Sequence, residues 1–580
     1  MQMRPRNWAL PNIFGAGSSV ERPWSIADLL VLGGVGALLG AGVWLAVNTP
    51  SVVRGPVINL APTALPWYAL LSVGRMAAAY ALSMVFTLIY GSAAAHSRRA
   101  AAVLLPLIDV LQSIPILSFL PVVLLVLIAI FPERVGVELA AIMLIFTSQV
   151  WNLTFSFYQA QTTIPTELRE AAAIFQLSPW LRFRRLELPF AAIPLIWNSM
   201  MSWAGGWFFL MAAEIFTLGP RDFRLPGLGA YLHTAADEDN LPALLMGLLA
   251  LVTVIVLLDQ LVWRPLLAWA DKFKLETVGG AEPPASWAYE VLSRARLMAT
   301  LGRTVWHPLV SRLDQRLARQ PAREDEPEAT RAVRRGLLPL LLAALALFAG
   351  YWAVRAGLLL AQMRGTEWVQ IAAGTAATLG RVTLSLVIAL AWTVPLGVAI
   401  GLNPRLAARL GPVVQVIASV PATALFPVIL LAFLRLPAGL NLAAVLLMLL
   451  GTQWYLLFNV IAGAAAIPRD LRDMSAMLGL SRRQRWRTLL LPAIFPFLIT
   501  GAITASGGAW NASIVAEYVT FGGQTRSVTG LGALIAAATA EANYPLLLAA
   551  TLTMIATVVI INRLVWRRLY AVAETRFRIE

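Results

Sequence analysis

REAAAIFQLSPWLRFRRLELP, residues 169–189, and RDMSAMLGLSRRQRWRTLLLP, residues 472–492, are two versions of one pattern. In each copy an acidic residue comes first, small residues and arginines follow, and a Leu-Pro pair closes the pattern. Each copy lies on a polar stretch between two long apolar segments. Two equivalent polar stretches predict two equivalent docking points for a partner outside the membrane.

The composition indicates a membrane protein. Of the 580 residues, 59% are hydrophobic and only 13% are charged. Many apolar runs reach about 20 residues, the length that a helix needs to cross a bilayer. We therefore expect an all-α, polytopic membrane protein with about twelve spans, near residues 26–47, 68–95, 103–131, 138–162, 190–218, 243–265, 337–360, 371–401, 411–434, 439–464, 493–520 and 546–566.

The repetition extends far beyond the opening pattern. Residues 74–91, GRMAAAYALSMVFTLIYG, resemble residues 380–397, GRVTLSLVIALAWTVPLG. Further along, MAAEIFTLG begins at Met211 and IVAEYVTFG begins at Ile514. The chain therefore reads as two tandem six-span halves in the same orientation, at residues 1–270 and 336–580, joined by a cytoplasmic linker at 271–335.

The arginines predict the orientation of the spans. Arg98, Arg99, Arg405 and Arg409 and both copies of the opening pattern fall on one side of the predicted topology. The positive-inside rule makes that side cytoplasmic, together with both termini. Inside loops and anionic lipid head groups account for the net charge of +15. We expect no nucleic-acid partner, because the sequence has no basic soluble domain.

The two copies resemble the EAA loop of the permease subunits of binding-protein-dependent ABC importers. In that family the loop carries Glu-Ala-Ala, a glycine and Leu-Pro at fixed spacing, and it forms a short cytoplasmic coupling helix that fits a groove of the ATPase. The resemblance assigns ATPase coupling to Glu170, Ala171, Ala172, Gln176 and Pro189 in a loop at 165–189, and to Asp473, Ser475, Gly479 and Pro492 in a loop at 468–492. It implies that each proline lies in the first turn of the following helix.

Shorter motifs, such as the Gly-Leu-Gly at residues 227–229 and the Ala-Glu at 213–214, are similar to the nitrate, sulfonate, taurine and bicarbonate branch of these permeases. The resemblance implies a type I ABC importer-like transmembrane fold in a bacterial cytoplasmic (inner) membrane. It also implies a small, often anionic, solute. The expected partners are two ATP-binding cassette ATPase subunits that bind ATP and Mg, an extracytoplasmic solute-binding protein, and the lipid bilayer.

We expect no enzymatic site in this chain. It has no Gly-rich phosphate-binding loop, and its only lysines, Lys272 and Lys274, lie in the linker. Its three histidines lack metal-ligand spacing, and it has no cysteine. ATP hydrolysis is therefore expected in a separate subunit, and no cofactor or metal is expected here.

Charged residues within spans are costly, by about 2.5–3.5 kcal/mol on insertion scales, and should be paired. Glu214 and Glu517 lie late in the fifth and eleventh spans, at a depth similar to that of Arg75 and Arg381 in the second and eighth. We predict the pairs Arg75–Glu214 and Arg381–Glu517 as candidate gate or translocation residues. A structural latch and interfacial charges that reach the head groups are the alternatives.

Polar residues in the fourth, fifth, tenth and eleventh spans are further candidates for the translocation pathway. They are Gln149, Gln453, Asn198, Asn511 and Ser513. The alternative role is hydrogen bonding between helices. Ser113-Ile114-Pro115 and Ser419-Val420-Pro421 predict kinks in the third and ninth spans, because proline frees backbone carbonyls.

The linker contains one helical pattern. Apolar residues from Trp287 to Leu301 recur at helical spacing with arginines between them, which predicts an amphipathic helix at the inner membrane surface. A mobile tether and a docking site for a further protein are the alternatives.

Two other classes of protein fit six plus six spans. A secondary transporter with parallel repeats would carry an acidic and basic signature between spans two and three, where this chain has AHSRRAAAV. A non-transporting membrane scaffold would leave the two coupling loops without a role. Stimulation of ATP hydrolysis by a binding protein and solute separates these alternatives.

Overall fold

A computed structural model describes residues 56–97, 131–218, 221–273, 286–295, 307–318 and 360–576, apart from positions 434, 522–523 and 542. Scattered positions within 100–130, 300–304 and 357–358 are also described. The predicted span at 26–47 lies outside these residues, and those at 103–131 and 337–360 are described only at scattered positions.

Long helices recur in the same order in both halves. The first half contains η1 (Pro62–Ala64), α2 (Leu65–His96), α5 (Glu133–Thr162), α8 (Leu188–Glu214) and α10 (Leu241–Leu258), which runs on into η3 (Asp259–Trp263), α11 (Arg264–Ala270) and η4 (Asp271–Phe273). The second half contains α16 (Gly365–Leu402), α19 (Gly439–Ala465), α22 (Leu491–Ala516) and α24 (Tyr544–Ile561), which runs on into η7 (Asn562–Trp566) and α25 (Arg567–Arg576).

Equivalent caps start equivalent helices. Asn240 precedes α10, and its side-chain oxygen accepts a hydrogen bond from the Ala243 amide at 3.1 Å. Asn543 does the same for α24, with the Leu546 amide at 3.3 Å. An asparagine cap of this kind satisfies one of the amides that a helix start leaves unpaired. The repeat therefore preserves the start signals of the helices as well as their apolar faces.

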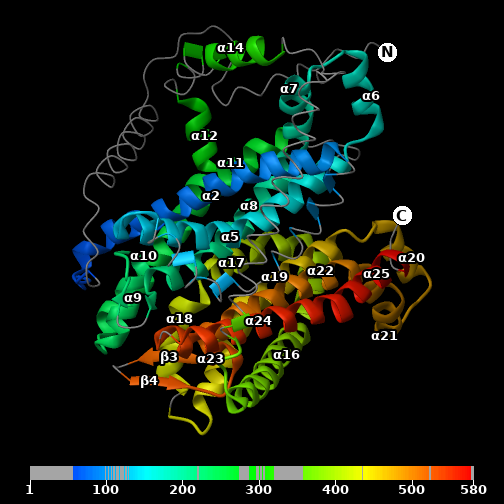
Figure 1. Ribbon diagram of the computed structural model, residues 1–580. Helices are drawn as coiled ribbons and strands as arrows, with labels where there is room; N and C mark the ends of the chain where they lie inside the picture. The colour runs from blue at the N-terminus through cyan, green and yellow to red at the C-terminus, as the bar shows by residue number, and fades with distance from the viewer. Residues whose placement is uncertain are drawn as a thin grey trace.

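Seven helices in the described part of the chain are long and apolar enough to cross a membrane, or eight if one bent pair is a single span. This supports a polytopic membrane fold, while the total of twelve spans stays a prediction. The halves stack in Figure 1, the first above the second, with their long helices running from left to right. One core cluster contains residues of both halves, among them Leu144, Ala212, Phe426 and Leu447.

The predicted ninth span, 411–434, is not a kinked helix but two helices. α17 (Pro404–Ser419) and α18 (Ala422–Phe433) meet at an angle of 79°. Val420 is extended there, with φ −72° and ψ 118°. Pro421 explains the break, because a proline disfavours helical geometry in the residue before it and cannot donate a backbone hydrogen bond.

The predicted fifth and eleventh spans, 190–218 and 493–520, run too far. α8 ends at Glu214 and α22 at Ala516, and each is followed by an antiparallel hairpin. The hairpins are β1 (Thr217–Leu218) with β2 (Arg221–Asp222), and β3 (Tyr518–Phe521) with β4 (Gln524–Ser527). Short helices follow them, α9 (Leu228–Asp237) and α23 (Leu531–Ala540). We call this side of the molecule, at the left of Figure 1, the hairpin end.

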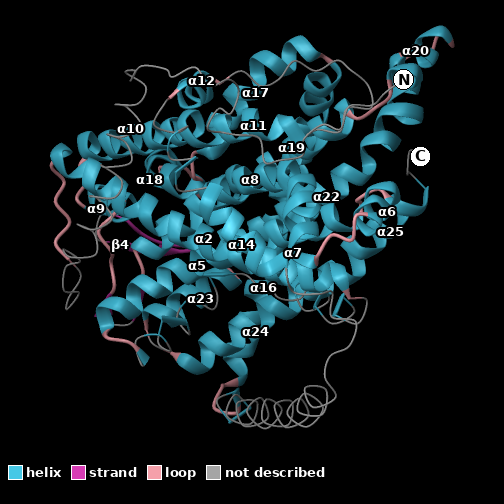
Figure 2. Ribbon diagram, turned by 90° about the horizontal axis from the view of Figure 1, so that it is seen from above, coloured by secondary structure: helices cyan, strands magenta, loops and turns pink. Residues whose placement is uncertain are grey.

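The opposite side carries the repeated pattern, and we call it the coupling end. Here α6 (Thr166–Ile174) and α7 (Pro179–Arg182) belong to the first half, and α20 (Arg469–Met477) and α21 (Arg482–Arg485) belong to the second. Figures 1 and 2 both place α6 and α20 at the right, away from the hairpins and α9.

Pro189 and Pro492 lie within the first two residues of α8 and α22. The chain before them is already helical, however, which the sequence analysis did not predict. The π-helical turns η2 (Phe183–Glu187) and η6 (Trp486–Leu490) lead directly into α8 and α22. Such wide turns occur where one residue breaks the regular hydrogen-bond ladder, and proline lacks the amide that the ladder needs.

The linker differs from the predicted single amphipathic helix. α12 (Trp287–Arg294) ends early because Ala295 is extended, with ψ 120°. A second helix, α14 (His307–Ala318), follows and packs against α7, as Figure 1 shows at the top. The part of the linker that contains α14 is therefore attached to the coupling end of the first half.

Candidate functional site

The two coupling helices have the same design. Glu170 on α6 and Asp473 on α20 are exposed, and so are Ala173 and Ala476. Ala172 and Ser475, which are equivalent in the repeat, are buried at 6% and 5% exposure. Each helix therefore packs one side against its own half and leaves its acidic residue accessible.

Both coupling helices end in a left-handed residue at the same position. Gln176 has φ +45° and Gly479 has φ +59°. The amide after it reaches back to a carbonyl five residues earlier, from Leu177 to Ala172 at 3.1 Å and from Leu480 to Ser475 at 3.3 Å. Glycine adopts this conformation without strain because it has no Cβ. The left-handed turn therefore explains why the EAA pattern has a glycine at this position.

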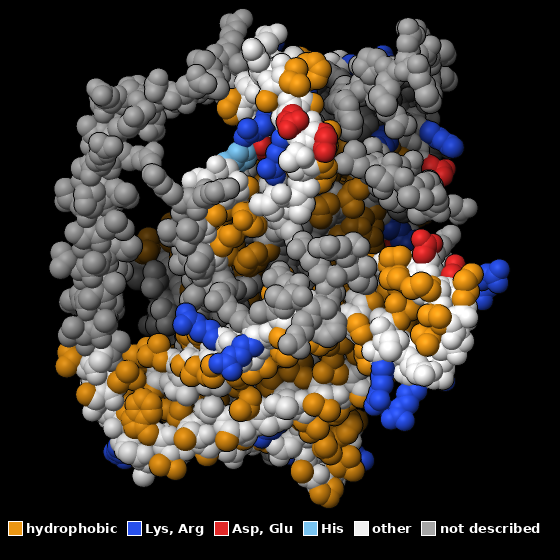
Figure 3. Space-filling view, turned by 90° about the vertical axis from the view of Figure 1, so that its right-hand side faces the viewer, with side chains coloured by type: hydrophobic (Ala, Val, Ile, Leu, Met, Phe, Trp, Pro, Cys, Tyr) orange, Lys and Arg blue, Asp and Glu red, His pale blue; other side chains and the backbone are white. Residues whose placement is uncertain are grey.

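Apolar side chains are exposed beside these turns. Ile174 and Phe175 are 79% and 76% exposed, and their equivalents Met477 and Leu478 are 88% and 67% exposed. Figure 3 looks onto the coupling end, where hydrophobic and arginine side chains lie next to each other. Exposed apolar patches with polar neighbours are typical of surfaces that bind another protein.

Charged contacts brace the first coupling loop. Glu187 accepts hydrogen bonds from Arg182 Nε and from His96 Nε2, each at 2.9 Å. Asp314 of α14 accepts a hydrogen bond from Trp180 Nε1 at 2.8 Å and forms an ion pair with Arg184. The linker is thus joined to α7 by one acidic side chain that contacts two loop residues.

The second coupling loop has different residues at these positions. Leu490 replaces Glu187 and is buried in an apolar cluster with Val460 and Ile494. Arg483 stands at the position of Trp180, so a tryptophan contact like that of the first loop is absent.

A buried charge cluster lies toward the hairpin end of the first half. Arg75 Nη1 is 2.8 Å from Glu214 Oε1, and Arg75 also makes two hydrogen bonds of 2.7 Å to Glu138. Glu214 accepts further hydrogen bonds from Ser72 Oγ at 2.6 Å and from the Gly229 amide at 2.7 Å. The carboxylate therefore caps the start of α9, where unpaired amides favour negative charge.

The second half contains the equivalent cluster. Arg381 Nη1 is 2.7 Å from Glu517 Oε1. Thr378 Oγ1 and the Gly532 amide donate to Glu517 at 2.8 Å and 2.9 Å. Asn441 takes the place of Glu138, at 2.7 Å from Arg381 Nη2. Both predicted ion pairs are thus present, each between two long helices of the same half, α2 with α8 and α16 with the end of α22.

Glycine is required beside each buried carboxylate. A Cβ at Gly227 would lie 2.2 Å from Glu214 Oε1, and one at Gly530 would lie 2.1 Å from Glu517 Oε2. Any side chain there would collide with the carboxylate. The Gly-Leu-Gly motif therefore allows the backbone to approach the glutamate.

A central cavity of about 660 Å³ lies between the halves. Its walls come from α8 of the first half and from α19, α22 and the α17–α18 break of the second half. The lining includes Trp197, Phe208, Tyr455, Thr504 and Asn511. The α8 residues in its lining, from Trp197 to Phe209, lie in the middle of that helix, between its start at the coupling end and its last turn at the hairpin end.

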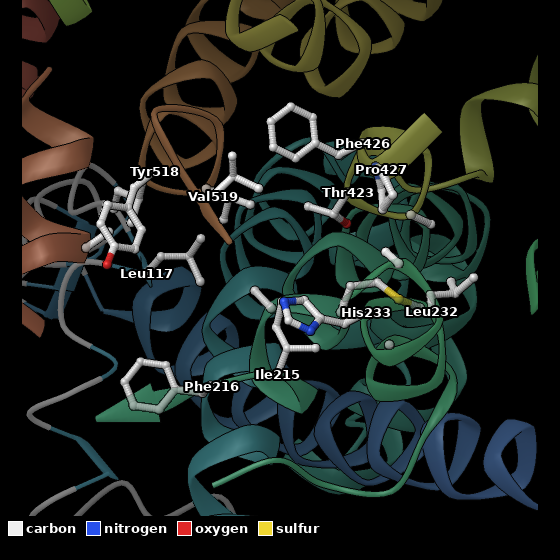
Figure 4. Close-up of a pocket in the computed structure, with 18 of the residues that line it drawn as sticks. Leu117, Ile215, Phe216, Leu232, His233, Thr423, Phe426, Pro427, Tyr518 and Val519 are labelled. Atoms are coloured by element: carbon white, nitrogen blue, oxygen red, sulfur yellow. The ribbon is translucent and has the colours of Figure 1, made fainter. Parts of the chain in front are cut away.

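A smaller pocket of about 230 Å³ lies nearer the hairpin end and is also lined by both halves. Figure 4 shows Leu117, Phe216 and Tyr518 on one side and Thr423, Phe426 and Pro427 on the other, with the ring of His233 pointing into the space. His233 Nδ1 is 3.0 Å from Asp237 Oδ2. The lining is mainly apolar, which suits a constriction that excludes water and ions.

The predicted pathway residues separate into two groups. Asn198 and Asn511 line the central cavity. Gln149, Gln453 and Ser513 are buried and are absent from the described lining of both cavities, as are the four residues of the ion pairs. Ser513 donates to the Trp510 carbonyl at 2.7 Å, and Gln149 Nε2 is 4.0 Å from Met76 Sδ.

The predicted kink at Ser113-Ile114-Pro115 lies outside the described residues, but Asn511 contacts the chain directly after it. Its side-chain oxygen accepts a hydrogen bond from the Ile116 amide at 2.6 Å. The amide therefore has a partner in the other half. A role in solute passage for any of these residues stays a prediction.

Sequence reasoning missed several parts of the site. The sequence analysis did not single out the aromatic residues of the cavity, Trp197, Tyr455 and Phe458. Glu138 could have been found, because it is an acidic residue in a predicted span and needs a partner. Among the described residues, no group of three or more metal-ligating side chains comes together.

Comparisons with known proteins agree with this architecture. The chain is 33% identical over 147 residues to the nitrate import permease protein NrtB of Leptolyngbya laminosa, which covers 25% of this chain and 51% of that protein. It is 31% identical over 161 residues to the bicarbonate transport system permease protein CmpB of Synechococcus elongatus, covering 28% and 55%. It is 32% identical over 145 residues to the riboflavin transport system permease protein RibX of Chloroflexus aurantiacus, covering 25% and 50%.

The chain spans about half the length of the curated relatives it matches. A family model matches it twice, at residues 84–262 and 393–579, and each match falls within one predicted half. The boundaries at 270 and 336 stay predictions. The double match, the repeated coupling helices and the apolar helices lead to one conclusion: this chain is a member of the binding-protein-dependent transport system inner membrane components, with two copies of the family's domain in one polypeptide.

Proposed function

We propose that this chain is the transmembrane translocation subunit of an ATP-driven importer, with the two halves forming the pathway between them. The observation that supports this most directly is the pair of coupling helices, α6 and α20. They present equivalent exposed apolar residues at one end of the molecule. The family implies ATPase and binding-protein partners in general, and two equivalent surfaces suit two ATPase subunits.

The orientation follows from the partners. The coupling end is cytoplasmic, where ATP is available, and the hairpin end receives solute from an extracytoplasmic binding protein in a bacterial inner membrane. ATP and Mg bind to the ATPase subunits, and this chain carries no catalytic site. The curated relatives bear the names of nitrate, bicarbonate and riboflavin transport. The nitrate and bicarbonate names favour a small anionic solute, whereas the riboflavin name favours an organic ring compound, so the names alone leave the class of solute open.

The two cavities suggest a mechanism of alternating access. When the ATPases close, they push α6 and α20 toward each other and rock the halves. The pocket at the hairpin end then opens while the central cavity closes toward the cytoplasm. Because each Arg–Glu cluster holds a long helix and a short helix together, each half moves as a rigid unit. We assign a latch role to Arg75, Glu214, Arg381 and Glu517.

The test is solute-stimulated ATP hydrolysis by the assembled complex in nanodiscs. The double variant Glu170→Arg, Asp473→Arg should lower stimulated hydrolysis by at least roughly tenfold, or about 1.4 kcal/mol of activation free energy. Glu290→Arg serves as the control, because Glu290 is an exposed acidic residue on α12, outside both coupling loops. Normal stimulation in the double variant would contradict coupling through these helices. Uptake without ATP would favour a secondary transporter.

A further inference from the structure

The central cavity has two chemically different walls, although the halves that form it are repeats. Trp197 and Phe208 of α8 line one side. Their equivalents on α22, 303 positions later, are Thr500 and Asn511, which line the other side. Met201 and Thr504 form a third such pair. At these three paired positions α8 supplies aromatic and thioether side chains, whereas α22 supplies hydroxyl and amide groups.

α19 adds further rings to the cavity. Trp454, Tyr455 and Phe458 all belong to the lining. The Tyr455 hydroxyl reaches across to α8 of the first half, where a Cβ at Gly205 would lie 2.9 Å from it. Planar side chains therefore approach the cavity from both halves, and the faces of aromatic rings are suited to stacking on another planar group.

The described lining contains no charged side chain. Its polar members are asparagine, glutamine, serine, threonine and tyrosine. An anion that leaves water is stabilised by positive charge or by several convergent donors, because burial of an unpaired charge is costly. Among the described lining residues no arginine or lysine supplies this stabilisation.

Most of the polar side chains in the lining already donate hydrogen bonds to other groups of the protein. Thr500 and Thr504 donate to carbonyls of their own helix at 3.0 Å and 3.2 Å, and Ser419 does so at 2.8 Å. The Asn198 amide nitrogen donates to Ser156 Oγ and to the Pro194 carbonyl, each at 3.0 Å. These groups present mainly lone pairs to the cavity, so they can accept hydrogen bonds from a solute.

A few neutral donors remain. The Tyr455 hydroxyl and the Asn152 amide have no hydrogen bond to the described residues. They can donate hydrogen bonds to carbonyl oxygens at the edge of a bound ring compound. The cavity volume also lies within the range of roughly 300–1,000 Å³ that is common for sites of small organic molecules.

We propose that the central cavity accommodates an uncharged, planar ring compound that carries hydrogen-bond donors, and not a small inorganic anion. The ring stacks on the aromatic wall of α8 and α19, and its N–H and O–H groups face the acceptors of α22. This inference rests on the proposed transport function and names the class of solute for the same pathway.

Riboflavin and flavin mononucleotide are matched probes. They share one fluorescent ring system, and only the second carries a phosphate group. The full-length chain in nanodiscs, without ATPase or binding protein, is titrated with each probe, and quenching of flavin fluorescence is followed. Empty nanodiscs correct for adsorption to lipid. Sodium nitrate and taurine are added as competitors.

Riboflavin should bind saturably and about tenfold or more tightly than flavin mononucleotide, because the phosphate must be buried without a positive partner. Nitrate and taurine should not displace it. Trp197→Thr, which copies the residue of the other wall, should weaken riboflavin binding, whereas the same change at the exposed Trp368 of α16 should not. Equal or tighter binding of flavin mononucleotide, displacement by nitrate, or no saturable binding of riboflavin would overturn the proposal.

The outcome is independent of the test for transport. The binding measurement contains no ATPase, so it can fail while coupled ATP hydrolysis remains normal. In the same way, loss of coupling in the α6 and α20 variants would leave binding in the central cavity unchanged.

Discussion

The two coupling loops have the same backbone but are held in place by different forces. Both end in a left-handed turn, at Gln176 and Gly479. The first is braced by ion pairs and by the linker helix α14, while the second rests on the buried Leu490. The comparison indicates that the backbone shape of the loop is kept in both halves, where a partner would contact it. The residues that hold the loop against its own half differ between the two copies.

The buried charge clusters diverged much less. Each has an arginine, a glutamate and a hydroxyl residue, and each caps a short helix with a carboxylate. The reason is physical, because amides at the start of α9 and α23 need an acceptor, and the nearby glycine leaves space only for that carboxylate. The remaining difference is that Arg75 faces two carboxylates, whereas Arg381 faces one carboxylate and Asn441.

The largest expected change in stability comes from removing Arg75, which faces two carboxylates, compared with Arg381, which faces one. Arg75→Gln should reduce the free energy of unfolding by about 3–5 kcal/mol, because it leaves Glu214 buried without a positive partner. Arg381→Gln should cost less, since only one carboxylate loses its partner. Thermal unfolding of the two purified variants in the same detergent measures the difference.

Double variants provide the control for this comparison. Arg75→Gln combined with Glu214→Gln should recover part of the lost stability, because the fully buried carboxylate is neutralised and only the partly exposed Glu138 lacks its partner. Strictly additive losses in both halves would show that the clusters do not act as ion pairs.

An intermediate effect is expected at the linker. Asp314→Ala removes the acceptor for Trp180 and Arg184, contacts of a kind worth about 1.5–3 kcal/mol when one partner is charged. α14 should then detach from α7, and limited trypsin digestion near the exposed Arg312 and Arg316 should become faster. Glu290→Ala is the matched control, because its ion pair with Arg294 is solvent-exposed. An unchanged cleavage rate would mean that Asp314 does not hold the helix.

The smallest effect concerns the left-handed turns. Gln176→Gly should stabilise the first loop and Gly479→Gln should destabilise the second, each by about 1 kcal/mol, because a residue with a Cβ is strained in this conformation. Hydrogen exchange of the amides in α6 and α20 measures each change locally. Shifts of the same sign in both loops would contradict the equivalence of the two turns.

Much of this fold follows from the sequence because repeats and burial costs are local signals. The 303-residue offset between repeated motifs predicted two halves, and the cost of an unpaired charge in a span predicted both Arg–Glu pairs. The turn at Gln176 and Gly479 also agrees with the glycine of the EAA pattern.

Other features depend on contacts that no local pattern records. The 79° break at Pro421 was expected only as a kink, because a proline signals a lost hydrogen bond but not the angle that neighbouring helices impose. The predicted spans extended into the first strand of each hairpin, Thr217–Leu218 and Tyr518–Phe521, because the apolar run of the helix continues into these strands. The docking of α14 relies on Asp314, one acidic residue among several in the linker.

The different walls of the central cavity show what a fused chain makes possible. In an assembly of two identical subunits, every substitution appears twice, so a tryptophan on one side of the pathway brings a tryptophan to the other. Here Trp197 and Thr500 are encoded separately. Natural selection can therefore adjust each side alone, and a substitution that improves one wall leaves the opposite wall intact.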